Sequence, residues 1–448
     1  MVLEYFEYPP QWKQHDGVLY QRYGDPKPSS KLAMFDMDNT LMLTPSTLVP
    51  DLVKGRKPWI NKPAIPNDFI LYNTNVKQKL QQEIADGKAI VICSNQSQLF
   101  EAPRVSKLIF VRIQLLLNEL DIPLYILLGF KRDLCRKPGP GMLTFYEEHL
   151  NNGIKVDRAN SFYVGDAAGR VWTDELLDAH CERVMALLKA EDFSNRHYVR
   201  RDRNFNDEPV DANAIIAKLK PSSLRNKFES DFSDCDLKYA LNNNIGFYTP
   251  EEYFANHPSM PLTVDFDPKK IGTNPAPLDV ADGMVILVGP PSGGKTFLCG
   301  NKFASFTRIS EDELRTRDAC LRYASKCLQK GENVIIDGTN ATAEERRDYI
   351  ALSRTAGVKC TVVFLDVSVN FAFHFLRYRK VSCAIGAILI IFQLVDPQKH
   401  AHLSQNVVRT YFKQLQPPDE SEGFDRLLRI TDETFPVQHT PVSQMHLP

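Results

Sequence analysis

The stretch Gly289-Pro290-Pro291-Ser292-Gly293-Gly294-Lys295-Thr296 decides how the second half of the chain folds. It fits the P-loop pattern of a glycine, four residues, a second glycine, a lysine and a serine or threonine. The run before it, Met284–Val288, is apolar and β-branched, as is typical of a buried parallel strand. Strand and loop together predict a binding site for a nucleoside triphosphate, with all eight loop residues in contact with the nucleotide.

Each residue type in this loop has a physical reason. Glycines let backbone N–H groups point at phosphate oxygens, and the following helix N-terminus adds positive potential. Lys295 would reach the β- and γ-phosphates, and Thr296 would help to hold Mg²⁺. The alternative is an ordinary Gly/Pro-rich turn, which the complete motif makes much the weaker interpretation.

Length and composition bound the remaining possibilities. A chain of 448 residues exceeds what one hydrophobic core usually supports, so two domains are expected. A hydrophobic content of 43% and a charged content of 24% are ordinary for a soluble globular protein. The net charge of −1 disfavours a pure nucleic-acid-binding module, because little phosphate would be neutralised. Nine cysteines without a C-x-x-C pair indicate neither a zinc site nor a disulfide framework.

In the first half, an aspartate pair follows a predicted strand. Lys31–Phe35 is short and apolar, and Asp36 and Asp38 come directly after it. Open α/β sheets place their sites at this end of a strand, and side chains at i and i+2 can project to the same side. Asp36 could attack phosphorus while Asp38 protonates the leaving oxygen. Taken alone, the pattern is equally typical of a turn.

Three later residues strengthen the chemical interpretation. Ser94 follows the predicted strand Lys88–Cys93, and its hydroxyl can bind a phosphoryl group. Lys137 places a cation before a proline, and Asp166 follows the predicted strand Ser161–Val164. Each has an ordinary alternative: a helix cap, a surface charge and a turn residue. The order of aspartate pair, hydroxyl, lysine and aspartate is much harder to obtain by accident.

This order resembles the haloacid dehalogenase superfamily of phosphotransferases. The resemblance implies that Asp36 is the nucleophile and Asp38 the acid/base. It also implies that Ser94 and Lys137 bind the phosphoryl group and that Asp166 joins Asp36 and Asp38 around Mg²⁺.

Downstream of the P-loop, acids and arginines supply further candidates. Ser310 is a good N-cap for a helix predicted to run to Gln329. On that helix Asp312 and Arg315 would lie three apart on one face, suited to a hydroxyl and a neighbouring phosphate. A strand then ends in Asp337, where P-loop folds keep residues near Mg²⁺.

Arg377 and Arg379 lie in a basic helix end that could form a lid over the transferring phosphoryl group. The alternative is a helix C-terminus enriched in cations.

A phosphatase pattern followed by a P-loop resembles the polynucleotide kinase 3′-phosphatase family from about Trp12 to Ile430. The matching stretches include Tyr163–Arg170, Thr249–Phe254 and Ile336–Asn340. The resemblance implies removal of a 3′-phosphate from a DNA strand end and transfer of the γ-phosphate of ATP to a 5′-hydroxyl, in the nucleus.

By the same resemblance, Asp312 is the general base, Arg315 binds a substrate phosphate, and Arg377 and Arg379 contact ATP.

Two α/β domains with mostly parallel sheets are therefore expected. The predicted boundaries are an N-terminal segment at 1–30, a phosphatase at 31–265, a linker at 266–280 and a kinase at 281–448. DNA strand ends and ATP are the expected partners, with no membrane. Because only some 30 residues precede the phosphatase strand, binding to phosphorylated scaffolds through a forkhead-associated domain is not expected.

The chain also departs from the family pattern. It is longer between Arg170 and Lys227, and the charged insert at 171–226 is predicted to be a surface loop without a packed core. The pattern resumes at Asp231, whose distance from the metal the sequence leaves open. An apolar run at 381–393 is either a buried helix or a foreign stretch such as a retained intron. RNA ends, small-molecule substrates and a weakened end-binding scaffold remain alternatives.

Overall fold

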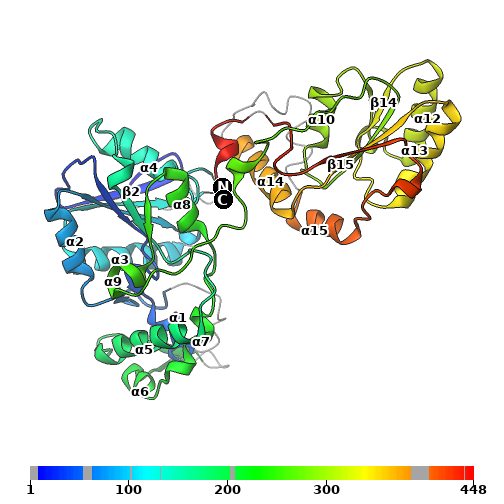
Figure 1. The fold of residues 1–448 in the computed structure, drawn as a ribbon. Helices are drawn as coiled ribbons and strands as arrows, with labels where there is room; N and C mark the ends of the chain where they lie inside the picture. The colour runs from blue at the N-terminus through cyan, green and yellow to red at the C-terminus, as the bar shows by residue number, and fades with distance from the viewer. Residues whose placement is uncertain are drawn as a thin grey trace. The chain divides into compact units, whose positions relative to one another are not determined.

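The computed structural model describes residues 9–53, 63–100, 103–131, 133–201, 207–384, 403–437 and 439–447. The chain divides into two compact units, Met1–Val264 and Asp265–Leu447 (Figure 1). Each unit is an α/β domain with its own sheet, as the sequence predicts. Among the described helices, none combines the length and apolar composition that a membrane-spanning helix requires.

The first unit is built on one seven-stranded sheet. Its order is β1 (Lys13–His15), β2 (Val18–Tyr23), β7 (Leu124–Gly129), β6 (Ala89–Asn95), β3 (Leu32–Phe35), β8 (Phe162–Val164) and β11 (Gly246–Tyr248). The pairs from β7 to β11 are parallel, and the pairs β1/β2 and β2/β7 are antiparallel. The carboxyl ends of β3, β6 and β8 therefore lie at one edge of the sheet.

Both faces of this sheet are buried, because alternate residues of a strand point to opposite sides. Ala33 and Phe35 of β3 pack into one apolar core, and Leu32 and Met34 into another. The first core includes side chains of α2 (Val76–Ala85), α3 (Pro103–Leu120) and α9 (Pro250–Ala255). The second includes side chains of α4 (Gly141–Phe145) and α8 (Cys235–Asn243). The sheet is thus a middle layer between helices.

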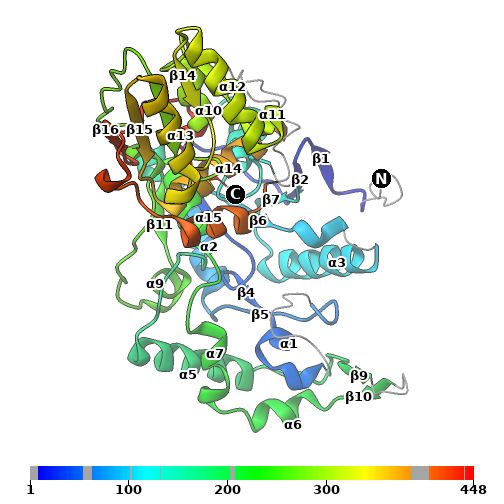
Figure 2. The same cartoon turned by 90° about the vertical axis from the view of Figure 1, so that its right-hand side faces the viewer.

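The insert at 171–226 is not the coreless surface loop that its charge suggested. It forms α5 (Asp174–Ala190), β9 (Val199–Arg201), β10 (Asp207–Pro209), α6 (Ala212–Ala217) and the start of α7 (Arg225–Phe228). Figures 1 and 2 show α5, α6 and α7 grouped with α1 (Pro45–Leu48) to one side of the sheet. Leu177, Cys181, Val184 and Leu188 all belong to the first core. Their helical spacing, which the charged residues between them obscure, gives α5 one apolar face.

The second unit has a five-stranded, all-parallel sheet. Its order is β13 (Thr307–Ile309), β14 (Val334–Ile336), β12 (Met284–Val288), β15 (Cys360–Leu365) and β16 (Arg426–Ile430). α12 (Arg317–Gln329) and α13 (Ala343–Ala356) pack on it through buried side chains. α10 (Lys295–Asn301) starts within the P-loop. The central strand β12 therefore leads directly into the predicted ATP site.

Two expectations in this unit need correction or extension. The helix predicted from Ser310 to Gln329 is broken into α11 (Glu311–Leu314) and α12, because Arg315 has a φ of 70° and Thr316 caps a new helix. α14 (Val369–Ala384) continues through the lid region into the first four residues of the apolar run 381–393. The rest of that run lies outside the described residues. α15 (Gln405–Gln414) packs against α14 through Val408.

Candidate phosphatase and kinase sites

The predicted phosphatase residues converge at the carboxyl edge of the first sheet. Asp36 follows β3, Ser94 lies near the end of β6, and Asp166 follows β8 by two residues. Lys137 comes from the loop between β7 and α4, and its ammonium donates to Asp36 Oδ1 at 2.7 Å. Because β3 lies between β6 and β8 in parallel register, these loops emerge side by side. The sheet topology accordingly gathers residues that are far apart in the sequence.

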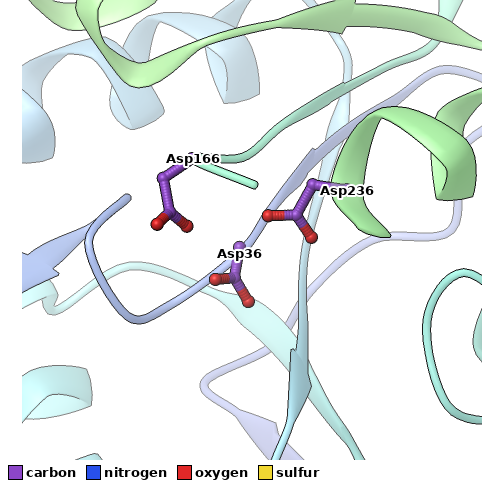
Figure 3. A group of neighbouring side chains, drawn as sticks. All are labelled: Asp36, Asp166 and Asp236. Atoms are coloured by element: carbon purple, nitrogen blue, oxygen red, sulfur yellow. The ribbon is translucent and has the colours of Figure 1, made fainter. Parts of the chain in front are cut away.

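A third carboxylate, Asp236, belongs to this centre. Oxygens of Asp36, Asp166 and Asp236 all lie within 4.8 Å of one another, and Figure 3 shows the three carboxylates converging. Asp236 is in the first turn of α8 and is 1% exposed. Its side chain passes so close to Gly165 that a Cβ there would lie 2.6 Å from it. The glycine before Asp166 therefore makes room for the extra acid.

The sequence reasoning missed Asp236 and considered Asp231 in its place. Asp231 accepts hydrogen bonds from the backbone N–H groups of Ala168 and Arg170 at 3.1 and 2.9 Å, and from Arg170 Nε at 2.8 Å. Asp231 thus fixes the loop that carries Asp166. The available signal for Asp236 was an acid in the first turn of a helix, which usually indicates only helix capping.

Lys137 is enclosed by oxygen atoms. Besides Asp36, its ammonium contacts Asp236 Oδ1 at 2.7 Å and donates to the Tyr163 hydroxyl at 2.6 Å. Burial opposes the charged form of Lys137, yet Asp236 and Asp36 together raise its pKa. The side chain of Asn95 donates to the carbonyl of Lys137 and accepts from its N–H, at 3.0 and 2.9 Å. The lysine is therefore held charged and in one position.

The electrostatics of the three acids fit a divalent cation. Burial raises the pKa of Asp36 to about 7 against the charge of Lys137, and Asp236 and Asp38 add to the rise. Burial also raises the pKa of Asp166 well above its usual range, with Asp236 and Asp36 contributing. A divalent cation would offset the repulsion between these acids in their charged form, and carboxylate oxygens are the ligands that Mg²⁺ prefers. Asp36, Asp166 and Asp236 thus form a group of acids that could hold a metal ion.

Asp38 lies beside this group but not within it. Its carboxylate accepts from the Arg112 guanidinium and, at 2.8 Å, from Gln96 Nε2. Gln96 also donates to Ser94 Oγ at 3.1 Å, so this amide links the two predicted residues. Asp236, and not Asp38, is the third carboxylate of the group that could hold a metal ion, and the metal-binding role of Asp38 stays a prediction. Its acid/base role stays a prediction.

In the second unit, the P-loop connects β12 to α10. Lys295 Nζ donates to the carbonyls of Gly289 and Pro290 at 2.9 and 2.8 Å. Thr296 Oγ1 donates to Asp337 Oδ2 at 2.9 Å, which brings the predicted metal-binding hydroxyl to the acid at the end of β14. The buried hydroxyl of Ser292 has no hydrogen-bond partner within the described ranges. A phosphate oxygen would satisfy it, so the loop fits a nucleotide.

Some of the other predicted kinase residues lie close enough to Lys295 to influence its pKa. Burial lowers the pKa of Lys295 to about 8, opposed by the charges of Asp337 and Asp312 and supported by that of Arg379. Asp312 and Arg379 are thus electrostatic neighbours of the P-loop lysine. Burial lowers the pKa of His374 to about 4, and the charge of Arg377 adds to this lowering.

Arg315 is exposed directly after α11, and its predicted role in binding a substrate phosphate stays a prediction.

Asp337 has one further cationic partner that the sequence reasoning overlooked. Arg308 Nε, from β13, donates to Asp337 Oδ2 at 2.7 Å. A single arginine on a neighbouring parallel strand gives no spacing signal, because its distance from Asp337 in the chain depends on the helices between the strands.

The comparisons with known proteins agree with this arrangement. Residues 31–254, half of the chain, match the family model described as polynucleotide kinase 3 phosphatase, and residues 284–382 match an AAA domain. A bifunctional polynucleotide phosphatase/kinase of Schizosaccharomyces pombe is 26% identical, over 81% of this chain and 74% of the relative. A protein of Acanthamoeba polyphaga mimivirus named for the same two activities is 24% identical, over 90% of this chain and 84% of the relative.

A third relative matches a smaller share of the chain. The polynucleotide 3′-phosphatase ZDP of Arabidopsis thaliana is 26% identical, over 57% of this chain and 28% of the relative. The matches thus span both units in the order phosphatase, then P-loop. The chain belongs to the bifunctional polynucleotide phosphatase/kinase family.

Proposed function

We propose that the chain is a DNA end-healing enzyme. It removes 3′-phosphates and phosphorylates 5′-hydroxyls with ATP, and so prepares strand breaks for ligation in the nucleus. The observation that carries the first activity is the group of three buried carboxylates around Lys137. For the second activity, the support is a P-loop whose lysine has Asp312 and Arg379 as neighbours.

In the phosphatase reaction, Asp36 attacks the phosphorus of the 3′-phosphate, and Asp38 protonates the leaving 3′-oxygen and then activates water. Ser94 and Lys137 donate hydrogen bonds to the phosphoryl oxygens. Bound Mg²⁺ would lower the repulsion between the carboxylates and the phosphate. The contact of Asp38 with Arg112 and Gln96 fixes the orientation of its carboxylate beside Asp36.

In the kinase reaction, Asp312 accepts the proton of the 5′-hydroxyl. Lys295 and the loop N–H groups hold the ATP phosphates, and Thr296 and Asp337 supply oxygens for Mg²⁺. Arg379 faces the transferring phosphoryl group from α14, where developing negative charge needs a cation.

The test is a paired assay on the purified full chain with Mg²⁺. A 3′-phosphorylated DNA oligonucleotide should lose phosphate, and a 5′-hydroxyl DNA oligonucleotide should gain it from ATP. The same two assays with RNA oligonucleotides and with sugar phosphates as competitors distinguish the substrate classes. If RNA ends or sugar phosphates compete better than DNA ends, the DNA assignment is wrong. If neither oligonucleotide reacts, the enzyme assignment itself fails.

A further inference from the structure

A pocket opens beside Asp166, and the insert builds one of its walls. The pocket has a volume of about 560 Å³, within the range of small-molecule sites. Asp166 and Arg170 line it on the side of the loop 165–170, which follows β8 and is called the metal loop below. Trp172 and His180 of the insert and Phe228 at the end of α7 also line it. Trp172 and His180 lie in the segment 171–226, and Phe228 lies two residues after it.

The three rings form a row that begins at the metal loop. The guanidinium of Arg170 lies 4.9 Å from the centroid of the Trp172 ring. Trp172 and His180 have their ring centroids 4.9 Å apart, and His180 and Phe228 have theirs 4.4 Å apart in an edge-to-face arrangement. Arg170 also donates to the carbonyl of Asp166 at 3.0 Å. The aromatic row is therefore attached to the residue that carries a metal-ligating carboxylate.

A buried acid holds this wall in place. Glu251, from α9, accepts from Arg170 at 2.8 Å and from the Tyr72 hydroxyl at 2.7 Å, and lies 3.6 Å from His180 Nδ1. Burial lowers the pKa of His180 to about 3, so the imidazole is neutral at physiological pH. All four side chains are buried. A wall fixed by such contacts can bind a ligand without a large ordering cost.

We propose that Trp172, with His180 and Phe228 next to it, is a substrate-binding wall that contacts the base of the 3′-terminal nucleotide, whichever base that is. This inference rests on the proposed function and adds the insert to the phosphatase site. Once the 3′-phosphate lies at Asp36 and Asp166, the attached nucleoside must occupy the adjoining space. Bases stack on aromatic side chains whatever their sequence, because every base has a π-face. The segment 171–226 thus supplies a base contact to the phosphatase site.

The test compares two 3′-phosphorylated oligonucleotides that differ only at the terminal nucleoside, which is either normal or replaced by a tetrahydrofuran residue without a base. Trp172→Ala should raise KM for the normal end about tenfold and leave KM for the base-free end unchanged. Trp172→Phe should restore most of the affinity. Tyr248→Ala removes a half-exposed ring that does not line the pocket, and it serves as the matched control.

Two further measurements keep the outcome decisive. Phe228→Leu, which keeps an apolar side chain, should reproduce the effect in part if Trp172→Ala does not fold. Equilibrium binding of both oligonucleotides to an Asp36→Asn variant separates binding from turnover. In this background, Trp172→Ala should weaken binding of the oligonucleotide with a normal terminal nucleoside about tenfold and leave binding of the base-free oligonucleotide unchanged. This result supports the wall even if the wild-type protein shows no turnover, in which case only the proposed function fails. An equal change for both ends, or none for either, overturns the inference.

Discussion

The two sites differ in how their lysines are held. Lys137 lies between carboxylates from different elements, Asp36 after β3 and Asp236 on α8, and is 3% exposed. Lys295 donates to two carbonyls of its own loop, and Asp312 nearby is exposed. Tertiary contacts therefore assemble the first site, whereas a local loop forms most of the second. Substitutions in the phosphatase site should disturb several elements together, and those in the kinase site should act locally.

The largest expected effects come from substitutions that each inactivate one of the two sites. Asp36→Ala should lower 3′-phosphatase activity by at least about 10³-fold because it removes the nucleophile. Lys295→Ala should lower 5′-kinase activity by about 10²- to 10³-fold because it removes a phosphate-binding cation. Each variant should keep the other activity within about twofold, since each site is built from residues of its own unit. Both activities are measured on the same preparation, and loss of both from either substitution contradicts separate sites.

The two arginines of α14 should differ although they lie two residues apart. Arg379 influences Lys295, whereas Arg377 influences His374. Arg379→Ala should therefore lower the kinase rate about 10²-fold, and Arg377→Ala no more than about tenfold. Steady-state kinetics with saturating ATP measures both variants. Equal losses would show that the two side chains form one lid, as the sequence suggested.

A smaller effect is expected from the acid that the sequence reasoning missed. Asp236→Asn keeps the side-chain shape but removes a negative charge from the metal-binding group. The Mg²⁺ concentration for half-maximal phosphatase activity should rise about tenfold, while the Mg²⁺ dependence of the kinase stays unchanged. Asp234→Asn is the matched control, because Asp234 pairs with Lys238 on the same helix. Identical Mg²⁺ curves for the Asp236 variant and the wild type would remove Asp236 from the site.

The smallest effect on activity, with a clear effect on stability, concerns the insert. Leu188 is fully buried, so Leu188→Ala should lower the free energy of unfolding of the first unit by about 2–5 kcal/mol. Its exposed neighbour provides the control: Lys189→Ala should change this free energy by less than about 0.5 kcal/mol. Chemical denaturation followed by both activities measures the difference. Similar unfolding curves for the two variants would show that the insert does not contribute to the stability of the first unit.

The sequence predicted most of the fold and the sheet-edge part of the phosphatase site. Asp36, Ser94 and Asp166 follow or end apolar strands, and parallel strands bring such ends together. It failed for Asp236, because this acid sits on a helix and its approach depends on the absence of a Cβ at Gly165. That contact is a property of packing between elements, which residue spacing does not encode.

The insert and α11 failed for different reasons. In the insert, charged residues hid the apolar positions 177, 181, 184 and 188, which carry a helical period. At the start of α12, the left-handed backbone of Arg315 ends one helix before Thr316 caps the next. An arginine gives little local indication of that conformation, since such residues rarely adopt positive φ. The insert was predicted wrongly because of its charged composition. The continuous helix from Ser310 to Gln329 was predicted wrongly because the backbone conformation at Arg315 breaks it.

The surroundings of Lys137 have a consequence for the timing of the reaction. An ammonium group has three N–H donors, and Asp36, Asp236 and Tyr163 engage them all. A phosphoryl oxygen can therefore gain this lysine only if one present partner gives it up. In the proposed reaction, the Asp36 carboxylate loses its charge when it forms a bond to phosphorus. Its attraction for the ammonium then weakens as negative charge develops on the substrate. One hydrogen bond of the Lys137 ammonium would then shift from the Asp36 carboxylate to a phosphoryl oxygen as the new bond forms. This shift would need no movement of the backbone that carries Lys137.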